Sequence, residues 1–229
     1  MVEQRTVGSQ QEAVFRLLNG KFKMPKTKNQ RSKIKNKSAI GTLHSAFKIG
    51  VMGSASDTLK ESTVVELNNK AKELGQAIAA IDGAIVLTGA TTGLPYLAGK
   101  FARDAGMFHI GISPAENERE HIEVYKYPTD NCDLIIYTGF GLKGRNVVLV
   151  RSCDIVLFIC GSMGALNEFT IAHDEGKVIG CLLGTGGVAD EARELLKIFK
   201  KKTDALIFHK EDPRLLVETC VNAIREKRQ

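Results

Sequence analysis

The sequence predicts an α/β fold in which a doubly wound, mostly parallel sheet of about seven strands carries helices on both faces. Short apolar runs of strand length alternate with longer segments whose apolar residues recur at helical spacing. Glycine and other small residues directly follow four of these runs, as they do in strand-to-helix turns. The composition agrees, because 43% of the 229 residues are hydrophobic, which is enough to build a sizeable core.

The expected strands alternate with helices from residue 47 to residue 226, except between the third and fourth strands. The strands are expected at 47–52, 84–88, 108–112, 134–138, 154–160, 178–183 and 205–208. The helices are expected at 57–80, 94–105, 142–152, 165–175, 190–200 and 213–226. The polar segment 115–131 contains Pro128 and charges of both signs, so we expect a loop near one edge of the sheet.

The basic character of the chain is concentrated at its start. Residues 1–40 hold ten Lys or Arg residues against only Glu3 and Glu12, a balance of +8, whereas the remainder of the chain carries −2. We therefore divide the chain into a basic extension, 1–45, which we expect to be disordered, and a domain, 46–229. The extension is either a solvated segment, including one created by a start codon assigned too far upstream, or a weak electrostatic arm for nucleic acid.

Composition also argues against several classes of protein. No apolar run reaches the roughly 18 to 20 residues of a membrane span, and no signal peptide is recognisable, so we expect a cytoplasmic protein without membrane contact. The five cysteines include no C-x-x-C pair, and the five histidines lie at no ligand spacing. We expect free thiols and no metal site.

Four small-residue turns, at 53–56, 89–93, 161–164 and 184–187, are expected at the carboxyl ends of strands. In a parallel sheet these ends meet at one edge, where ligands bind near the switch point in strand order. Any one such turn alone is explained as an ordinary strand-to-helix turn, but four together favour a site for an anionic ligand. The ligand-binding or phosphate-binding candidates are Gly53, Ser54, Ala55, Gly89, Thr91, Thr92, Gly161, Ser162, Met163, Gly164, Ala165 and Thr185.

Two common nucleotide motifs are absent. Five residues, rather than four, separate Gly93 from Gly99, and Phe101 stands where a phosphate-binding P-loop has Ser or Thr. The turn after Gly50 lacks the G-x-G-x-x-G order, and the strand ending at Thr88 carries no carboxylate for a ribose diol. These departures disfavour a P-loop enzyme and an NAD-dependent dehydrogenase.

Residues 145–168 resemble the LOG-like superfamily of Rossmann-type proteins, whose signature is P-G-G-x-G-T-x-x-E with an Arg one helix and one strand upstream. Gly161, Gly164 and Glu168 match the signature, and Arg145 matches the upstream Arg. The signature's proline, second glycine and threonine are replaced by Cys160, Ser162 and Ala165. The resemblance extends over about residues 46–226 and is greatest to the molybdenum-cofactor-carrier-like branch, so it implies a Rossmann-like domain.

In enzymes of this superfamily, the resemblance implies hydrolysis of the N-glycosidic bond of a nucleoside 5′-monophosphate. Arg145 and Glu168 are then the catalytic candidates: Arg145 neutralises the phosphate or the departing base, and Glu168 holds ribose hydroxyls, stabilises positive charge or positions water. The structural alternative makes Glu168 a first-turn carboxylate that the helix dipole favours and Arg145 a surface cation or the partner of that carboxylate.

Two functions follow. We prefer a small-molecule binding or carrier protein that holds a phosphate-bearing ligand, a nucleotide or a molybdopterin-type cofactor, because the signature is altered. The alternative is a nucleoside 5′-monophosphate phosphoribohydrolase. The resemblance also implies a homo-oligomer, for which the apolar residues Val147, Val148 and Leu149 could provide a face, although the same residues could cover the sheet.

Overall fold

The computed structural model describes residues 46–54 and 61–228. The expectations for the basic extension and for Ala55 therefore lie outside the described residues. The strands are β1 (Phe47–Gly53), β2 (Ala84–Thr88), β3 (His109–Ser113), β4 (Leu134–Tyr137), β5 (Ile155–Ile159), β6 (Val178–Leu182) and β7 (Leu206–Lys210). The helices are α3 (Glu61–Ala79), α4 (Leu94–Asp104), α5 (Glu118–Glu123), α6 (Gly141–Ser152), α7 (Met163–Asp174), α8 (Gly187–Ile198) and α9 (Pro213–Lys227).

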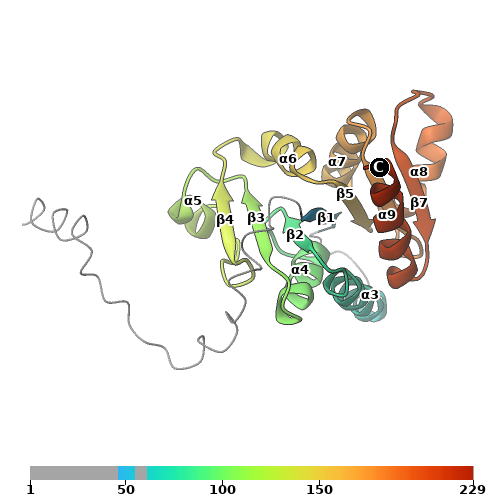
Figure 1. The fold of residues 1–229 in the computed structure, drawn as a ribbon. Helices are drawn as coiled ribbons and strands as arrows, with labels where there is room; N and C mark the ends of the chain where they lie inside the picture. The colour runs from blue at the N-terminus through green and yellow to red at the C-terminus, as the bar shows by residue number, and fades with distance from the viewer. Residues whose placement is uncertain (1–45, 55–60, 229) are drawn as a thin grey trace, which may run out of the picture. The chain divides into compact units, whose positions relative to one another are not determined.

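The described strands form one sheet of seven in the order β4-β3-β2-β1-β5-β6-β7, and every neighbouring pair is parallel. The predicted parallel α/β architecture is confirmed (Figure 1). The chain runs outward in one direction from β1 to β4 and then returns to place β5 on the other side of β1. The switch point in strand order therefore lies between β1 and β5, where Gly53 pairs with Ile159.

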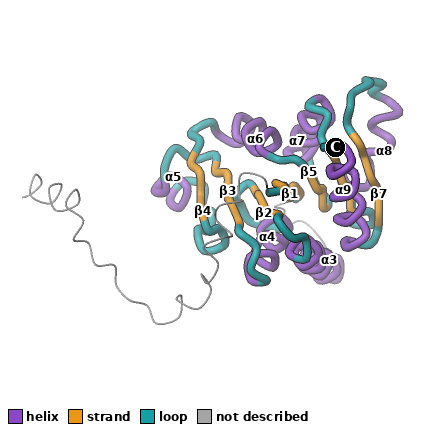
Figure 2. Tube along the Cα trace, viewed as in Figure 1, coloured by secondary structure: helices purple, strands orange, loops and turns teal. Residues whose placement is uncertain are grey.

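Two layers of helices bury the sheet (Figure 2). One core joins α3, α4 and α9 to the sheet through residues such as Ile49, Leu157 and Ile159. The other joins α6, α7 and α8 to it through residues such as Met52 and Phe158. Alternate residues of β5 face opposite layers and all five are buried, which explains why this strand reads as an unbroken apolar run.

The three apolar residues of α6 that we considered for an oligomer interface, Val147, Val148 and Leu149, differ in burial. Leu149 is fully buried and Val148 packs against the second core, so both cover the sheet. Val147 alone of the three is exposed.

The segment 115–131 is not the simple loop that we expected, because it contains the short helix α5. The Asn117 side chain accepts a hydrogen bond from the Glu120 amide at 3.0 Å, and the Glu120 carboxylate accepts one from the Glu116 amide at 2.6 Å. These two hydrogen bonds cap the start of a helix in a polar sequence that has no apolar periodicity. The spacing of Asn117 and Glu120 was the sequence signal for it.

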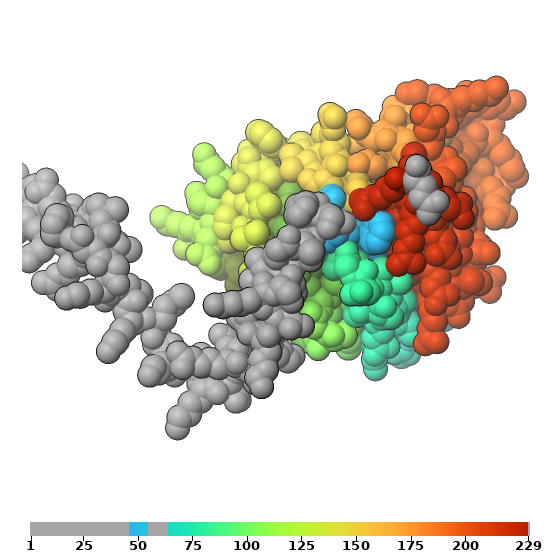
Figure 3. All heavy atoms as spheres, in the orientation of Figure 1, coloured from blue at the N-terminus to red at the C-terminus, as the bar shows by residue number. Residues whose placement is uncertain are grey.

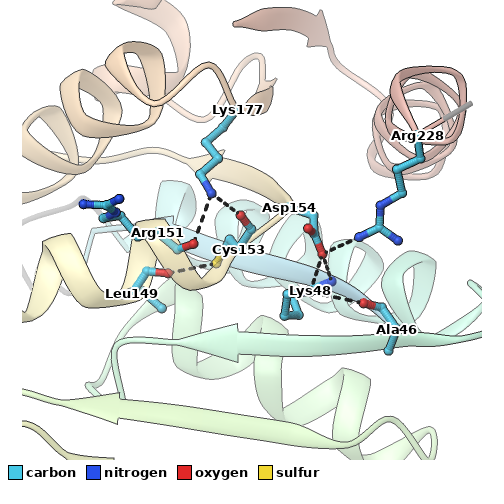
Figure 4. A network of polar contacts seen from close by, with 8 residues as sticks. All are labelled: Ala46, Lys48, Leu149, Arg151, Cys153, Asp154, Lys177 and Arg228. Carbon is cyan, nitrogen blue, oxygen red and sulfur yellow. Dashed lines mark hydrogen bonds and ion pairs between the residues drawn. The ribbon is translucent and has the colours of Figure 1, made fainter. Parts of the chain in front are cut away.

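Charged side chains hold the amino edge of the sheet together (Figure 4). Asp154, directly before β5, pairs with Lys48 of β1 at 2.9 Å and with Arg228, just beyond α9, at 3.0 Å. Lys177 donates to the Cys153 carbonyl oxygen beyond the end of α6. In the space-filling view, α9 in red therefore lies against residues 46–54 in blue (Figure 3).

Cysteine thiols in the described residues are free, and four of the five are buried. No described helix combines the length and the apolar character that a membrane crossing requires. The part of the chain that the structure describes holds no group of three or more His, Cys, Asp or Glu residues placed to bind a metal ion.

Candidate functional site

A cleft of about 170 Å³ lies at the carboxyl edge of the sheet, at the switch point. The strand ends of β1 and β2 supply its floor, and α6 and α7 contribute charged and polar side chains. Its lining residues are Val51, Met52, Gly53, Gly89, Thr91, Pro95, Tyr127, Leu142, Lys143, Arg145, Asn146, Ser162, Gly164, Ala165 and Glu168.

The turn between β5 and α7 is held in a strained conformation. Cys160 has φ 58° and Gly161 has φ 116°, both in the left-handed region that a cysteine rarely adopts. The Cys160 amide donates to the Thr185 hydroxyl at 2.8 Å, and the Gly161 carbonyl accepts from the Val188 amide at 3.0 Å. The neighbouring β6–α8 turn therefore fixes the path of the backbone into α7.

The beginning of α7 lies against the cleft and has no side-chain cap. Ser162 is the N-cap residue, but its side chain makes no capping hydrogen bond, and Gly164 and Ala165 of the first turn line the cleft. Uncapped first-turn N–H groups together with the positive end of the helix dipole favour an anion at this place.

Arg145 brings a positive charge into the cleft from the second turn of α6. The residue is only 6% exposed, and its guanidinium donates to the Ile112 carbonyl oxygen at 3.4 Å, a long hydrogen bond that leaves most of its donors for a ligand. Burial lowers the pKa of Arg145, while Glu168 and Tyr127 act to raise it. Gly89 makes room for this side chain, because a Cβ atom at Gly89 would overlap Nη1 and lie 2.7 Å from Cζ.

Glu168 is buried in the same cleft, at 7% exposure. Burial raises the pKa of its carboxyl to about 7, although the positive charges of Arg145 and Lys143 act to lower it. The side-chain NH₂ of Asn146, in the orientation that its neighbours require, donates to Glu168 Oε1 at 3.0 Å and to the Leu142 carbonyl oxygen at 3.0 Å. Glu168 can therefore gain or lose a proton near neutral pH.

Two backbone amides of the fourth small-residue turn, 184–187, already have a hydrogen-bond acceptor within the chain. The Asp190 carboxylate accepts hydrogen bonds from the Gly184 amide at 2.8 Å and from the Gly186 amide at 2.9 Å. The hydroxyl of Thr185 donates to the Leu182 carbonyl oxygen at 2.6 Å and accepts from Cys160. Thr185 thus supports the β5–α7 turn from beneath, and this fourth turn does not offer the open donors that α7 offers.

Comparison with known proteins places the chain in a family. A family model described as LDcluster4, SLOG cluster4 family, matches residues 46–217. The chain belongs to the SLOG cluster4 family. An uncharacterised protein of Archaeoglobus fulgidus is 29% identical over 112 residues, which are 49% of this chain and 68% of that protein.

Solved structures agree with this assignment. TM1055 is similar to the chain with a TM-score of 0.63 and 29% identity, over 79% of this chain and 99% of TM1055. The molybdenum cofactor carrier protein of Chlamydomonas reinhardtii has a TM-score of 0.58 and 27% identity, over 79% and 99%. The molybdenum cofactor binding protein of Rippkaea orientalis has a TM-score of 0.58 and 25% identity, over 80% and 98%. The LOG-like superfamily and its molybdenum-cofactor-carrier-like branch are confirmed.

The structure of this SLOG cluster4 member brings most of the sequence candidates together. The candidates that line the cleft are Gly53, Gly89, Thr91, Arg145, Ser162, Gly164, Ala165 and Glu168. Ser54 is buried directly after β1, Gly161 lies within the β5–α7 turn, Thr185 supports that turn from beneath, and Thr92 and Met163 are exposed. Among the described residues, these five do not line the cleft.

Sequence reasoning missed several lining residues, chiefly Asn146, Lys143 and Tyr127. Lys143 and Asn146 lie close to Arg145 in the sequence of α6, and their nearness to Arg145 in the expected helix 142–152 was the signal that could have found them. Tyr127 comes from the segment that follows α5, and its approach to the cleft depends on the path of that segment through space.

Proposed function

We propose that this protein binds a phosphate-bearing small molecule, a nucleotide or a molybdopterin-type cofactor, in the cleft at the carboxyl edge of the sheet and acts as its carrier. The observation that carries the proposal is the pairing of buried Arg145 with the uncapped beginning of α7 in one cleft. A phosphate would receive charge-assisted hydrogen bonds from the guanidinium and backbone donors from Gly164 and Ala165. Ser162 adds a hydroxyl at the same place.

The residues fit the phosphate end of either ligand. Gly89 leaves the space in which the Arg145 guanidinium lies, and Gly53 leaves the space in which Ile159 of the neighbouring strand lies. Glu168 can accept hydrogen bonds from ligand hydroxyls when ionised and donate one when protonated. A molybdopterin-type compound would be cargo here, held through its phosphate by Arg145 and α7. The relatives whose names refer to molybdenum cofactor binding or carriage support this choice.

Isothermal titration calorimetry with adenosine 5′-monophosphate, ribose 5-phosphate and adenosine tests the proposal. The two phosphate esters should bind and adenosine should bind much more weakly. Arg145→Gln should weaken binding of both esters by about tenfold or more, since a hydrogen bond to a charged group contributes about 1.5–3 kcal/mol. The matched control is Arg151→Gln, which removes an exposed cation of the same helix that pairs with Glu175 outside the cleft. Equal affinity for adenosine and its monophosphate would refute the proposal.

A second candidate function, hydrolysis of nucleoside 5′-monophosphates to base and ribose 5-phosphate, is favoured by the carboxyl of Glu168. An acid whose pKa is about 7, buried beside a cation, can transfer a proton at neutral pH. We expect a hydrolase to release free base, measured chromatographically, and Glu168→Gln to abolish release without abolishing binding. If no base is released from any monophosphate at protein concentrations near that of the substrate, the hydrolase is excluded and the carrier is retained.

Three coarser expectations stay proposals alongside this one. We infer a homo-oligomer from the family resemblance and a cytoplasmic location from the sequence composition, and light scattering and cell fractionation test them. Nucleic-acid contact through residues 1–40 is a weaker proposal. It predicts an affinity that falls steeply with salt and disappears when these residues are deleted.

A further inference from the structure

An aromatic wall lies beside the same cleft, formed by Tyr127 and the Tyr125 ring stacked on it in the segment that follows α5. Tyr127 lines the cleft, and the ring of Tyr125 stacks on it with centroids 5.5 Å apart and an interplanar angle of 22°. Tyr127 is half-buried, so part of its surface is available to a ligand. Pro95 and Leu142 add further apolar surface to the lining.

The chain holds this pair of rings in place at some conformational cost. Lys126, between the two tyrosines, has φ 56°, a left-handed conformation that is unfavourable for a residue with a side chain. The Tyr125 amide donates to the Glu120 carbonyl oxygen at 3.1 Å, and the Tyr127 amide donates to the His121 carbonyl oxygen at 3.1 Å. These bonds turn the chain sharply around Lys126 and fix both tyrosines relative to α5.

A buried histidine anchors the segment to the sheet. His121 is fully buried, and its Nε2 lies 3.1 Å from the Pro128 carbonyl oxygen, to which it donates. Its Nδ1 is then left to accept from the Ser113 hydroxyl at 2.8 Å, at the end of β3. The His121 ring also meets the Tyr127 ring edge-on, with centroids 5.7 Å apart. Tyr127 is therefore positioned by the sheet itself and not by an unsupported loop.

The chemistry of this wall differs from that of the rest of the cleft. Arg145 and α7 offer charge and donors for a phosphate, whereas a tyrosine ring offers a flat π-surface that stacks on another flat ring. A ribose ring has no such face. Burial raises the pKa of the Tyr127 hydroxyl, and although Arg145 acts to lower it, the side chain stays neutral beside a bound anion.

Resting on the phosphate-binding function proposed above, we propose that Tyr127, on which Tyr125 is stacked, recognises a planar heteroaromatic ring in the ligand. The ligand class is then a phosphate monoester that also carries such a ring, as a purine nucleotide or a phosphorylated pterin does. A plain sugar phosphate fills only the polar end of the cleft. Tyr127 acts as the specificity-determining residue, and His121 acts as the positioning residue behind it.

The test compares three probes on the full chain by calorimetry: ribose 5-phosphate, adenosine 5′-monophosphate and neopterin phosphate. At least one of the two ring-bearing probes should bind the unmodified protein about fivefold or more tighter than ribose 5-phosphate does. A factor of about five in affinity is the lower limit of what one stacking contact contributes. Adenosine 5′-monophosphate and neopterin phosphate are separate arms, so they distinguish a nucleotide from a pterin. This comparison needs no variant.

Three variants then assign the preference to its residue. Tyr127→Leu should remove the preference and leave the affinity for ribose 5-phosphate unchanged, whereas Tyr127→Phe should retain it. Tyr137→Leu is the matched control, because Tyr137 also meets His121 edge-on at 5.7 Å but does not line the cleft. Thermal melting of each variant shows that it is folded.

The outcomes separate the two proposals. If ribose 5-phosphate binds as tightly as both ring-bearing probes, or if Tyr127→Leu weakens all probes equally, ring recognition is refuted while phosphate binding stands. If no phosphate ester binds at all, phosphate binding fails and ring recognition fails with it.

Discussion

Replacing Gly89 by alanine should weaken phosphate binding without unfolding the protein. The added Cβ would overlap Arg145 Nη1 and lie 3.0 Å from Nη2, so the guanidinium has to leave its place in the cleft. The backbone of Gly89 lies outside the left-handed region, so alanine introduces no strain of its own. The atom that must move is the far end of a flexible side chain, and movement there is easy.

The expected magnitudes follow from what Arg145 contacts. A hydrogen bond to a charged group is worth about 1.5–3 kcal/mol, so its loss should weaken affinity by roughly 10- to 150-fold. The fold loses only the 3.4 Å hydrogen bond from Arg145 to the Ile112 carbonyl oxygen. Exchanging glycine for alanine gains about 0.4–1 kcal/mol by restricting the unfolded chain. The free energy of unfolding should therefore change by no more than about 1 kcal/mol.

Calorimetry with adenosine 5′-monophosphate measures the affinity, and urea unfolding measures the stability. The double variant of Gly89→Ala and Arg145→Gln is the control, because two changes that act through one guanidinium should not add. Unchanged affinity in Gly89→Ala would show that the ligand does not use Arg145 in this position. A loss of stability of about 3 kcal/mol or more would show that Gly89 is needed for packing and not for the site.

Three further predictions concern stability. Burial raises the pKa of Glu168 from its ordinary value of 4.5 to about 7 in the folded chain, so between these pH values the folded state holds a proton that the unfolded state has lost. The free energy of unfolding, measured with urea, should therefore fall by up to about 3 kcal/mol as the pH rises from about 4.5 past 7. Glu168→Gln should remove this pH dependence. Asp190→Ala should destabilise the domain by about 1–2 kcal/mol, because the Gly184 and Gly186 amides lose their acceptor; no change in the urea midpoint would contradict this. Burial acts to raise the pKa of Asp154, but hydrogen bonds from Lys48 and Arg228 lower it overall. Asp154→Asn should therefore lower the free energy of unfolding by about 1 kcal/mol at neutral pH, and by progressively less as the pH falls through the folded-state pKa of the carboxyl. A penalty for Asp154→Asn that is equal at pH 7 and pH 3 would refute the ion-pair account.

The sequence predicted the elements well where the pattern is local and strong. The run from Ile155 to Ile159 is apolar on both faces, which is typical of a central parallel strand, and the structure buries all five residues. Boundaries were less accurate: α8 begins at Gly187 and not at residue 190, because the turn before it is tightened by Asp190. Helix α5 was missed because it is started by capping side chains and carries no apolar stripe.

By itself, the sequence determined that strands and helices alternate, that small residues end the strands, and that Arg145, Gly161, Gly164 and Glu168 follow a LOG-like pattern. These are properties of neighbouring residues, so local periodicity and turn chemistry encode them. The placement of the residues around the cleft was decided by the tertiary structure alone.

Tertiary structure decided which small-residue turn remains open to a ligand. The first turn of α7 has no side-chain cap and lines the cleft, whereas the Asp190 carboxylate accepts from the amides of the β6–α8 turn. It also placed Gly89 under the guanidinium of Arg145 and brought Tyr127 to the same cleft. Each of these contacts depends on where the strand order reverses and on how buried polar groups find partners, and both are settled only when distant segments pack together.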